Sequence, residues 1–161
     1  AVVSIERSTG QRIVGWFTRS PQTVATRRIL AEEGFLFDSG AVNDEIPYFS
    51  EVSGRPFLIV PYSIDVNDFR FWKGSFFTAR DFEAYCIDCF DALYLESARR
   101  PRMMSVGLHP RVIGRPGRIG GLDRFLAHVR NFPDVWITRR TDIARFWAER
   151  FAPANTWNWS G

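Results

Sequence analysis

The sequence predicts an α/β fold with a mostly parallel sheet and outer helices. Short apolar segments alternate with longer amphipathic ones, in the order strand, helix, strand, strand, helix, strand, helix, strand, helix. Apolar strands of about four to six residues are typical of a sheet covered by helices. Aromatic residues make up 16% of the 161 residues, so the chain can bury a sizeable core.

The first part of the chain is expected to contain two helices and three strands. A helix over 1–8 closes at Thr9 and Gly10. Ser20 and Pro21 are suited to be the N-cap and first residue of the next helix, which ends at Gly34. Strands are expected over 12–17, 35–38 and 57–60, with a polar loop over 40–56 between the last two.

The second part is expected to contain three helices and two strands. Thr78 is suited to cap the strongest helix, which runs to about Ser97, and Thr141 to cap the last one, which runs to about Phe151. Between them, a helix over 117–131 turns five apolar residues inward: Ile119, Leu122, Phe125, Leu126 and Val129. Strands are expected over 103–108 and 135–138, with irregular segments over 62–75 and 109–116.

The two cysteines, Cys86 and Cys89, form a single C-x-x-C within a helical apolar pattern. A zinc site usually needs a second cysteine pair or nearby histidines. We therefore interpret both thiols as core-facing or half-buried residues of one helix. So few cysteines fit a reducing cytoplasm, which is the expected location.

The charge pattern does not favour nucleic acid as a partner. The net charge is +3, and the 21 basic residues, all arginine except Lys73, are scattered among 18 acidic ones. A membrane is not an expected partner either, because no stretch approaches the roughly 20 apolar residues of a membrane-spanning helix.

Polar residues follow several of the expected strands, where the sites of parallel α/β folds gather. His109 directly follows an apolar segment, and an imidazole there is either a general acid or base or a structural loop histidine. Asp65 and Asp68 either bind metal, orient a base or cap a turn. Arg19 is either a carboxylate clamp or a surface arginine.

Several segments, in this order and spacing, carry a family resemblance. They are Gly15 to Pro21, Gly34 to Ser39, Pro61 to Phe71, Pro101 to His109 and Ile113 to Arg118. Together they resemble the carboxyl-terminal part of a NodB-like polysaccharide deacetylase domain, and more narrowly the branch that includes allantoinases of the polysaccharide deacetylase type. The likeness covers residues 1–151, and residues 152–161 form an aromatic tail with Trp157 and Trp159.

The resemblance implies a portion of a deformed (β/α) barrel and hydrolysis of an amide-type C–N bond. It implies that Arg19 and Pro21, as an R-x-P motif, steady a catalytic aspartate. Asp65, Asp68 and Phe69 match a D-x-x-D-aromatic motif that shapes the site and holds that arginine, and His109 matches the general acid. Arg111 and Arg115 are expected to meet a polar substrate. The sugar deacetylases usually have Trp at the place of Phe69, and Leu at the place of Gly107. These departures favour the allantoinase-like branch.

The family's catalytic and metal-binding aspartates, on its first strand, and its H-x-x-x-H pair are absent from this sequence. We therefore expect the acid side of a site without its base, no metal ligands in this chain, and inactivity without the amino-terminal part. A divalent metal such as zinc is possible through that part. We expect one of two origins for the present chain. It is either one chain of a nicked enzyme, whose second chain carries the amino-terminal part, or a proteolytic fragment. Exposed strand edges predict an oligomer rather than a soluble monomer.

The expected substrate is a small amide or ureide, with allantoin as the first candidate. Two alternatives stay open: an N-acetyl-sugar deacetylase acting on polysaccharides or chito-oligosaccharides, and a non-catalytic binding or assembly module.

Overall fold

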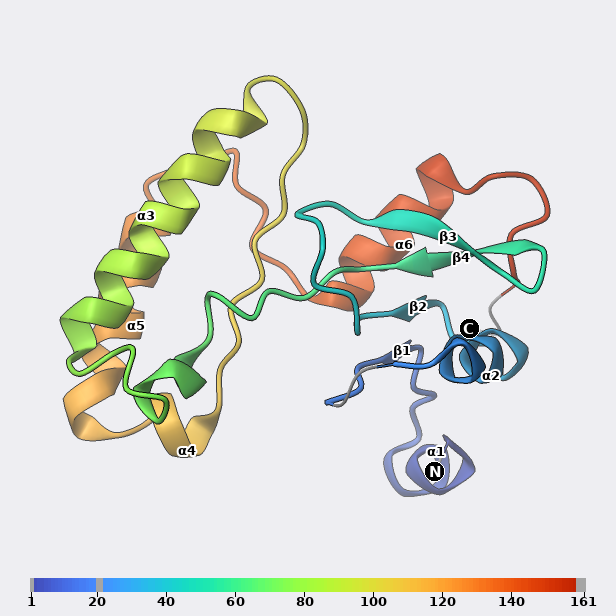
Figure 1. Cartoon of the computed structure of the whole chain (residues 1–161), viewed down its shortest axis with the longest axis horizontal. Helices are drawn as coiled ribbons and strands as arrows, with labels where there is room; N and C mark the ends of the chain where they lie inside the picture. Colours follow the sequence, from blue (N-terminus) through green and yellow to red (C-terminus); the bar gives the residue numbers. More distant parts are fainter. Residues whose placement is uncertain (1, 20–21, 159–161) are drawn as a thin grey trace. The chain divides into compact units, whose positions relative to one another are not determined.

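The computed structural model describes residues 2–19 and 22–158, which divide into two compact units (Figure 1). The first unit comprises the chain up to Tyr62 together with the segment from Thr138 onward. The second comprises Ser63–Ile137. Ser20 and Pro21, the expected helix start, lie outside the described residues.

A four-stranded sheet of order β1-β2-β4-β3 forms the centre of the first unit. The parallel strands are β1 (Gly15–Trp16), β2 (Phe37–Asp38) and β4 (Arg55–Ile59), and β3 (Tyr48–Val52) pairs antiparallel with β4. The register aligns Gly15 with Phe37, Phe37 with Leu58, and Tyr48 with Ile59. The predicted α/β class with mostly parallel strands is therefore confirmed.

The hairpin of β3 and β4 corrects the polar loop that was predicted over 40–56. Its turn is made by Ser53 and Gly54, whose φ angles are +51° and +75°. Two successive positive φ angles match the right-handed twist of the flanking strands, which favours a tight hairpin. The strand β3 was not predicted because most of its residues are half-buried or exposed. It therefore lacks the apolar run that is typical of a fully buried strand.

The described residues of the first unit form the helices α1 (Val2–Thr9), α2 (Val24–Glu32) and α6 (Arg140–Phe151). The N-cap of α2 is Thr23, whose hydroxyl accepts the backbone N–H of Thr26 at 3.2 Å. The N-cap of α6 is Arg139, so the predicted cap at Thr141 is wrong by two residues. The core of this unit lies between α2 and the sheet and contains Leu30, Ala31, Phe35, Ala41, Val52, Phe57 and Ile59.

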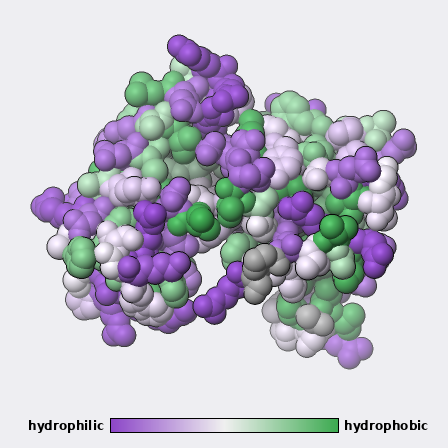
Figure 2. Space-filling model, viewed as in Figure 1, coloured by the Kyte–Doolittle hydropathy of each residue, from purple (hydrophilic) through white to green (hydrophobic). Residues whose placement is uncertain are grey.

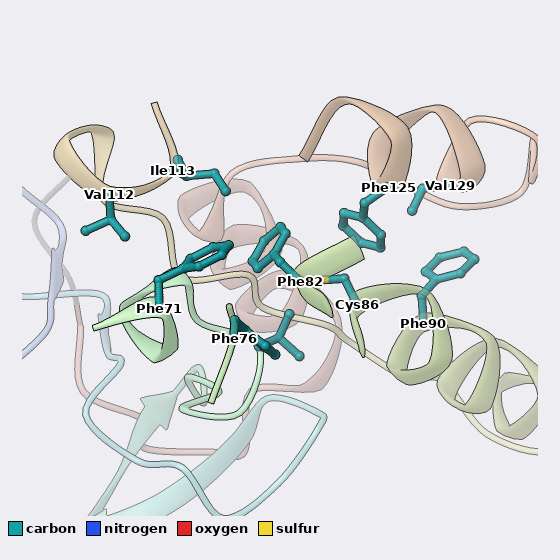
Figure 3. Packing of buried hydrophobic residues seen from close by; sticks show 10 residues of the cluster. Phe71, Phe76, Phe82, Cys86, Phe90, Val112, Ile113, Phe125 and Val129 are labelled. Atoms are coloured by element: carbon teal, nitrogen blue, oxygen red, sulfur yellow. The ribbon is translucent and has the colours of Figure 1, made fainter. Parts of the chain in front are cut away.

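The second unit is built on two long helices, α3 (Ala79–Ser97) and α5 (Pro116–Val129), with a short helix α4 (Pro110–Ile113) and a 3-10 turn η1 (Asp68–Phe71). Thr78 is the N-cap of α3, as predicted. Aromatic rings fill the core, as Figure 3 shows; the buried residues include Phe71, Phe76, Phe82, Phe90 and Phe125.

Cys86 and Cys89 both lie on α3 as free thiols, in agreement with the helical interpretation. Cys86 is fully buried, and Cys89 is half-buried. Burial raises the pKa of Cys86 to about 12, so its reactive thiolate form is nearly absent at neutral pH.

Two predicted strands and part of a predicted helix face are wrong. Residues 103–108 contribute only a single parallel bridge, from Gly107 to Asn67, and residues 135–138 form no strand. In α5 the face against α3 is narrower than expected, because Gly121, Phe125 and Val129 are buried at a spacing of four residues. Ile119 and Leu126, which were expected to point inward, are 44% and 40% exposed.

A substitution at Gly121 tests the close approach of α3 and α5. A Cβ added there would collide with the backbone carbonyl oxygen of Ala79, which cannot rotate away. We expect Gly121→Ala to lower the free energy of unfolding by about 1–3 kcal/mol. Gly117→Ala is the matched control, since its Cβ meets nothing within 4 Å and alanine favours a helix by about 0.5–1 kcal/mol. Urea denaturation measures both, and an equal response of the two variants would contradict the close approach.

The N-terminal cap of α3 contributes a stability that depends on pH. The carboxylate of Asp81 accepts the backbone N–H groups of Thr78 and Phe77 at 2.8 and 2.9 Å, and these bonds hold its pKa below the ordinary 3.8. A carboxyl group with a lowered folded pKa stabilises the fold above its unfolded pKa and stops doing so as pH falls through the folded value. We expect Asp81→Asn to lower the melting temperature at pH 6, with a difference from wild type that shrinks as the pH falls below 3.8. A difference that stays constant from pH 6 to pH 2 would contradict the role of the charge.

Candidate functional site

A fully buried carboxylate, that of Asp68, joins two segments of the second unit. Its Oδ1 atom lies 2.7 Å from Nδ1 of His109. Its Oδ2 atom accepts the backbone N–H groups of His109 at 2.7 Å and Ile113 at 3.1 Å. The side chain of Asp68 therefore holds the ring of His109 and the backbone at the start and the end of α4, which spans Pro110–Ile113.

Local sequence features bring these two segments side by side. The backbone N–H of Asp68 donates to the carbonyl of Gly107 at 3.0 Å, next to the parallel bridge between Asn67 and Gly107. The side chain of Asn67 caps η1, which starts at Asp68. Pro110 occupies the first turn of α4, directly after His109.

The ring of His109 remains accessible on one side. Its side chain is 31% exposed, and the ring of Phe69 lies against it, with centroids 5.1 Å apart. Because Nδ1 is the ring nitrogen that meets the carboxylate, Nε2 is the nitrogen left for proton transfer, an arrangement that lets an imidazole work as a general acid or base.

The other predicted site residues of the second unit are placed as follows. Asp65 is mostly exposed and forms an ion pair with Arg70 at 3.4 Å. Arg111 lies on α4 with its guanidinium 5.4 Å from the ring centre of Trp72. Arg115 is exposed at the N-cap of α5. The structure thus groups Phe69, Asp68, His109 and Arg111 on two adjoining segments, and it places Asp65 in a separate surface pair.

The two predicted residues of the first unit follow β1. Arg19 is exposed there, and Pro21 lies outside the described residues. The roles that the R-x-P resemblance implies for these residues stay predictions.

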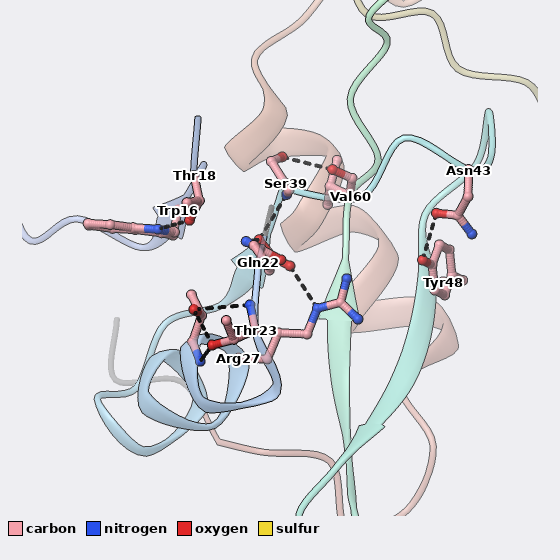
Figure 4. Close-up of polar contacts among 12 residues, drawn as sticks. Trp16, Thr18, Gln22, Thr23, Arg27, Ser39, Asn43, Tyr48 and Val60 are labelled. Carbon is pink, nitrogen blue, oxygen red and sulfur yellow. Dashed lines mark hydrogen bonds and ion pairs between the residues drawn. The ribbon is translucent and has the colours of Figure 1, made fainter. Parts of the chain in front are cut away.

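A second polar cluster, in the first unit, was missed at the sequence level. Asp38 is fully buried at the end of β2, where it accepts the backbone N–H of Gly40 at 2.8 Å and Nε of Arg27 at 3.1 Å, as well as the side-chain amide of Gln22. Two of these donor residues, Gln22 and Arg27, are labelled in Figure 4. The signal in the sequence is weak, because only three apolar residues, 35–37, precede this carboxylate. Its bonds hold the end of β2 to the start of α2.

Arg140 supplies a partly buried cation in the same unit. Its guanidinium donates to the hydroxyl of Ser39 at 2.5 Å and to the carbonyls of Val60 and Pro61 at 3.2 and 3.1 Å. Burial lowers the pKa of Arg140 below its ordinary value. These bonds fasten the first turn of α6 to the carboxyl ends of β2 and β4.

His109 lines neither of two hollows formed by the described residues. A cavity of about 320 Å³ in the first unit lies between β3, β4, α6 and the segment at Trp157. A shallower one of about 410 Å³ in the second unit lies beside α3, at Phe77 and Tyr85. Across the described ranges, 2–19 and 22–158, no three histidine, cysteine or acidic side chains are grouped so that they could hold a metal ion.

Hydrophilic side chains are spread over the face shown in Figure 2. Within the part of the chain that the structure describes, none of the helices has the length and apolar character needed to cross a bilayer.

Comparison with known proteins identifies similar sequences and folds. A Schizosaccharomyces pombe protein named "Putative polysaccharide deacetylase" is 38% identical over 125 residues, which are 71% of this chain and 39% of that protein. The crystal structure of Puue allantoinase is 41% identical with a TM-score of 0.86, over 93% of this chain and 51% of that one. The structure of a "probable Polysaccharide deacetylase" from Pseudomonas aeruginosa PAO1 is 42% identical with the same TM-score and the same coverage. No protein-family model matches.

These findings confirm the resemblance to the NodB-like polysaccharide deacetylase family, including its allantoinase-like members. The fold is also similar to that of a Mycobacterium smegmatis structure, which is 23% identical with a TM-score of 0.81. The chain spans about half the length of the solved structures that it matches, and less of the Schizosaccharomyces pombe protein.

Removal of the buried Asp68 carboxylate tests how much this group stabilises the fold. Asp68→Ala leaves the backbone N–H of His109 without its acceptor, whereas the N–H of Ile113 keeps the carbonyl of His109 at 3.0 Å. Because an N–H group left without an acceptor costs about 1–3 kcal/mol, we expect urea denaturation to show a loss of that size. Asp65→Ala is the control, because its mostly exposed ion pair contributes at most about 1 kcal/mol. Equal losses in the two variants would contradict the clamp.

Proposed function

We propose that this chain supplies the proton-donating side of an enzyme site that hydrolyses a non-peptide C–N bond of a small amide or ureide, with allantoin as the first candidate. The observation that carries the proposal is the 2.7 Å contact between the buried carboxylate of Asp68 and Nδ1 of His109. The similarity to an allantoinase and to two proteins named as polysaccharide deacetylases supports a hydrolase of this family.

In this proposal, His109 acts when the C–N bond breaks. Water adds to the amide carbonyl, and the tetrahedral intermediate collapses with loss of the nitrogen, which leaves easily only when it takes up a proton. Nε2 of His109 donates that proton. Asp68 holds the ring in one orientation and stabilises the positive charge that the ring carries before the transfer.

The water-activating base is proposed to come from the rest of the domain, as an aspartate steadied by Arg19 and Pro21. Asp65 and Asp68 shape the acid side, and Arg115 contacts the substrate. The described residues hold no metal-ligand group, so the ligands of any divalent ion would also come from outside them. We propose that the 161-residue chain is inactive alone and works with a polypeptide that carries the base. The proposed location, the cytoplasm, follows from its few cysteines.

The deacetylase alternative rests on the polysaccharide deacetylase names of two similar proteins, one 38% and one 42% identical. Turnover of allantoin and of a chito-oligosaccharide by the complete protein separates the two functions. We expect release of allantoate from allantoin. Acetate release from the oligosaccharide, with no allantoin turnover, would establish the alternative.

Substitution of His109 tests the proposed acid. In the complete protein, we expect His109→Gln to lower kcat about 10²- to 10⁴-fold with KM changed less than about threefold. His128→Gln is the control, because His128 pairs with Asp91 between α3 and α5 and has no proposed role in the reaction. Thermal unfolding confirms that both variants are folded. Unchanged kcat in His109→Gln would remove this residue from the acid role.

The composition of the active species tests the proposed partner. Intact mass and a denaturing gel should reveal a second segment carrying paired aspartates and an H-x-x-x-H sequence in any active preparation. Size-exclusion chromatography of the 161-residue chain should show association rather than a compact monomer. Turnover by this chain alone, or a compact monomer that binds no hydrophobic dye, would contradict the arrangement.

A further inference from the structure

We propose that Trp72 is a substrate-binding residue beside His109 that selects small planar amides, such as ureides and imides, over sugars. In this arrangement the indole ring stacks on the flat amide plane, and the guanidinium of Arg111 binds its carbonyl oxygens. The inference rests on the proposed function, since it takes His109 as the proton donor to the same substrate.

A continuous series of ring contacts leads from His109 to Trp72. The rings of His109 and Phe69 have centroids 5.1 Å apart, with planes inclined at 56°. Phe69 in turn meets Trp72 at 4.9 Å in an edge-to-face contact. The guanidinium of Arg111 lies 5.4 Å from the centre of the Trp72 ring, within the range of a cation–π contact. These side chains form a wall that starts at the imidazole, which we call the Trp72 wall.

The Trp72 wall is fixed in place by the same carboxylate that orients His109. Trp72 follows η1 directly and donates its backbone N–H to the carbonyl of Phe69 at 3.0 Å. Arg111 lies on α4, whose start and end are held by the Oδ2 atom of Asp68. The two elements that carry the wall are therefore clamped at their junction, so the wall keeps its position relative to the proton donor.

The exposure of Trp72 leaves surface for a ligand. Its side chain is 51% exposed although it contacts both Phe69 and Arg111. A flat conjugated group gains stacking energy on such a ring. A second surface aromatic residue, Phe77, is 83% exposed and belongs to a different part of the unit, at the start of α3, so it offers a matched control.

The guanidinium of Arg111 favours ligands that present several carbonyl oxygens in one plane. Guanidinium groups bind carbonyl and carboxylate oxygens through paired N–H donors, and a charged partner makes these bonds stronger than bonds between neutral groups. A ureide or imide presents several carbonyl oxygens in one plane, and opening a cyclic amide produces a carboxylate. An N-acetylated sugar presents a single amide carbonyl, beside neutral hydroxyl groups that are not coplanar with it. The Trp72 wall therefore fits the ureide better.

The experiment compares two substrates in the complete protein. Trp72→Ala is expected to raise KM for allantoin about fivefold or more with kcat changed less than about twofold, whereas Trp72→Phe retains most of the affinity. Arg111→Lys keeps the charge but loses the paired donors, so it should also raise KM for allantoin. Phe77→Ala should leave both constants at the wild-type values.

The outcomes separate this inference from the proposed function. If Trp72→Ala leaves KM for allantoin unchanged while His109→Gln abolishes turnover, the wall is wrong and the proposed function stands. If Trp72→Ala raises KM for a chito-oligosaccharide as much as it raises KM for allantoin, the claimed selectivity is wrong. If His109→Gln retains full turnover, the proposed function fails. A separate titration of the complete protein with allantoin, followed by the Trp72 indole N–H signal in NMR, should show a shift that N-acetylglucosamine does not produce; equal shifts or none would overturn the inference.

Discussion

Asp68 places a carboxylate where water cannot reach it, and three hydrogen bonds compensate for the cost of burying that group. Two of these bonds go to the backbone of the loop that carries His109, and the third goes to the imidazole itself. A loop of this kind would otherwise be free to move, because α4 is only four residues long. The same side chain thus determines the position of the proton donor and the local structure around it.

Sequence patterns predicted the long helices better than the strands. The cap at Thr78 and the helix behind it were predicted correctly because capping and helical periodicity are local properties. The hairpin of β3 and β4 was missed because its strand is largely solvent-accessible and its turn residues, Ser53 and Gly54, are also common in loops. Residues 103–108 look like a strand because most of them are apolar, but pairing depends on a neighbouring strand, and the bridge from Gly107 goes to Asn67, which lies outside the named strands.

The candidate site shows a similar division. The resemblance implied that His109 and Asp68, 41 residues apart, belong to one site, but it assigned Asp68 to an arginine, and the contact between Asp68 and His109 was not predicted. Asp38 and Trp72 were missed for different reasons. A single acidic residue at the end of a two-residue strand gives a weak signal, and Trp72 lies in a segment rich in aromatic residues where nothing in the sequence distinguishes an exposed ring from a core ring. Only tertiary contacts make that distinction.

The burial of Cys86 gives the second unit an internal reporter. Its thiol can meet an alkylating reagent only when α3 separates from the aromatic core, whereas the half-buried Cys89 is one turn away on the same helix. The rate at which Cys86 is modified, compared with that of Cys89, therefore measures how often this helix detaches under native conditions. The chain carries this probe without any added label.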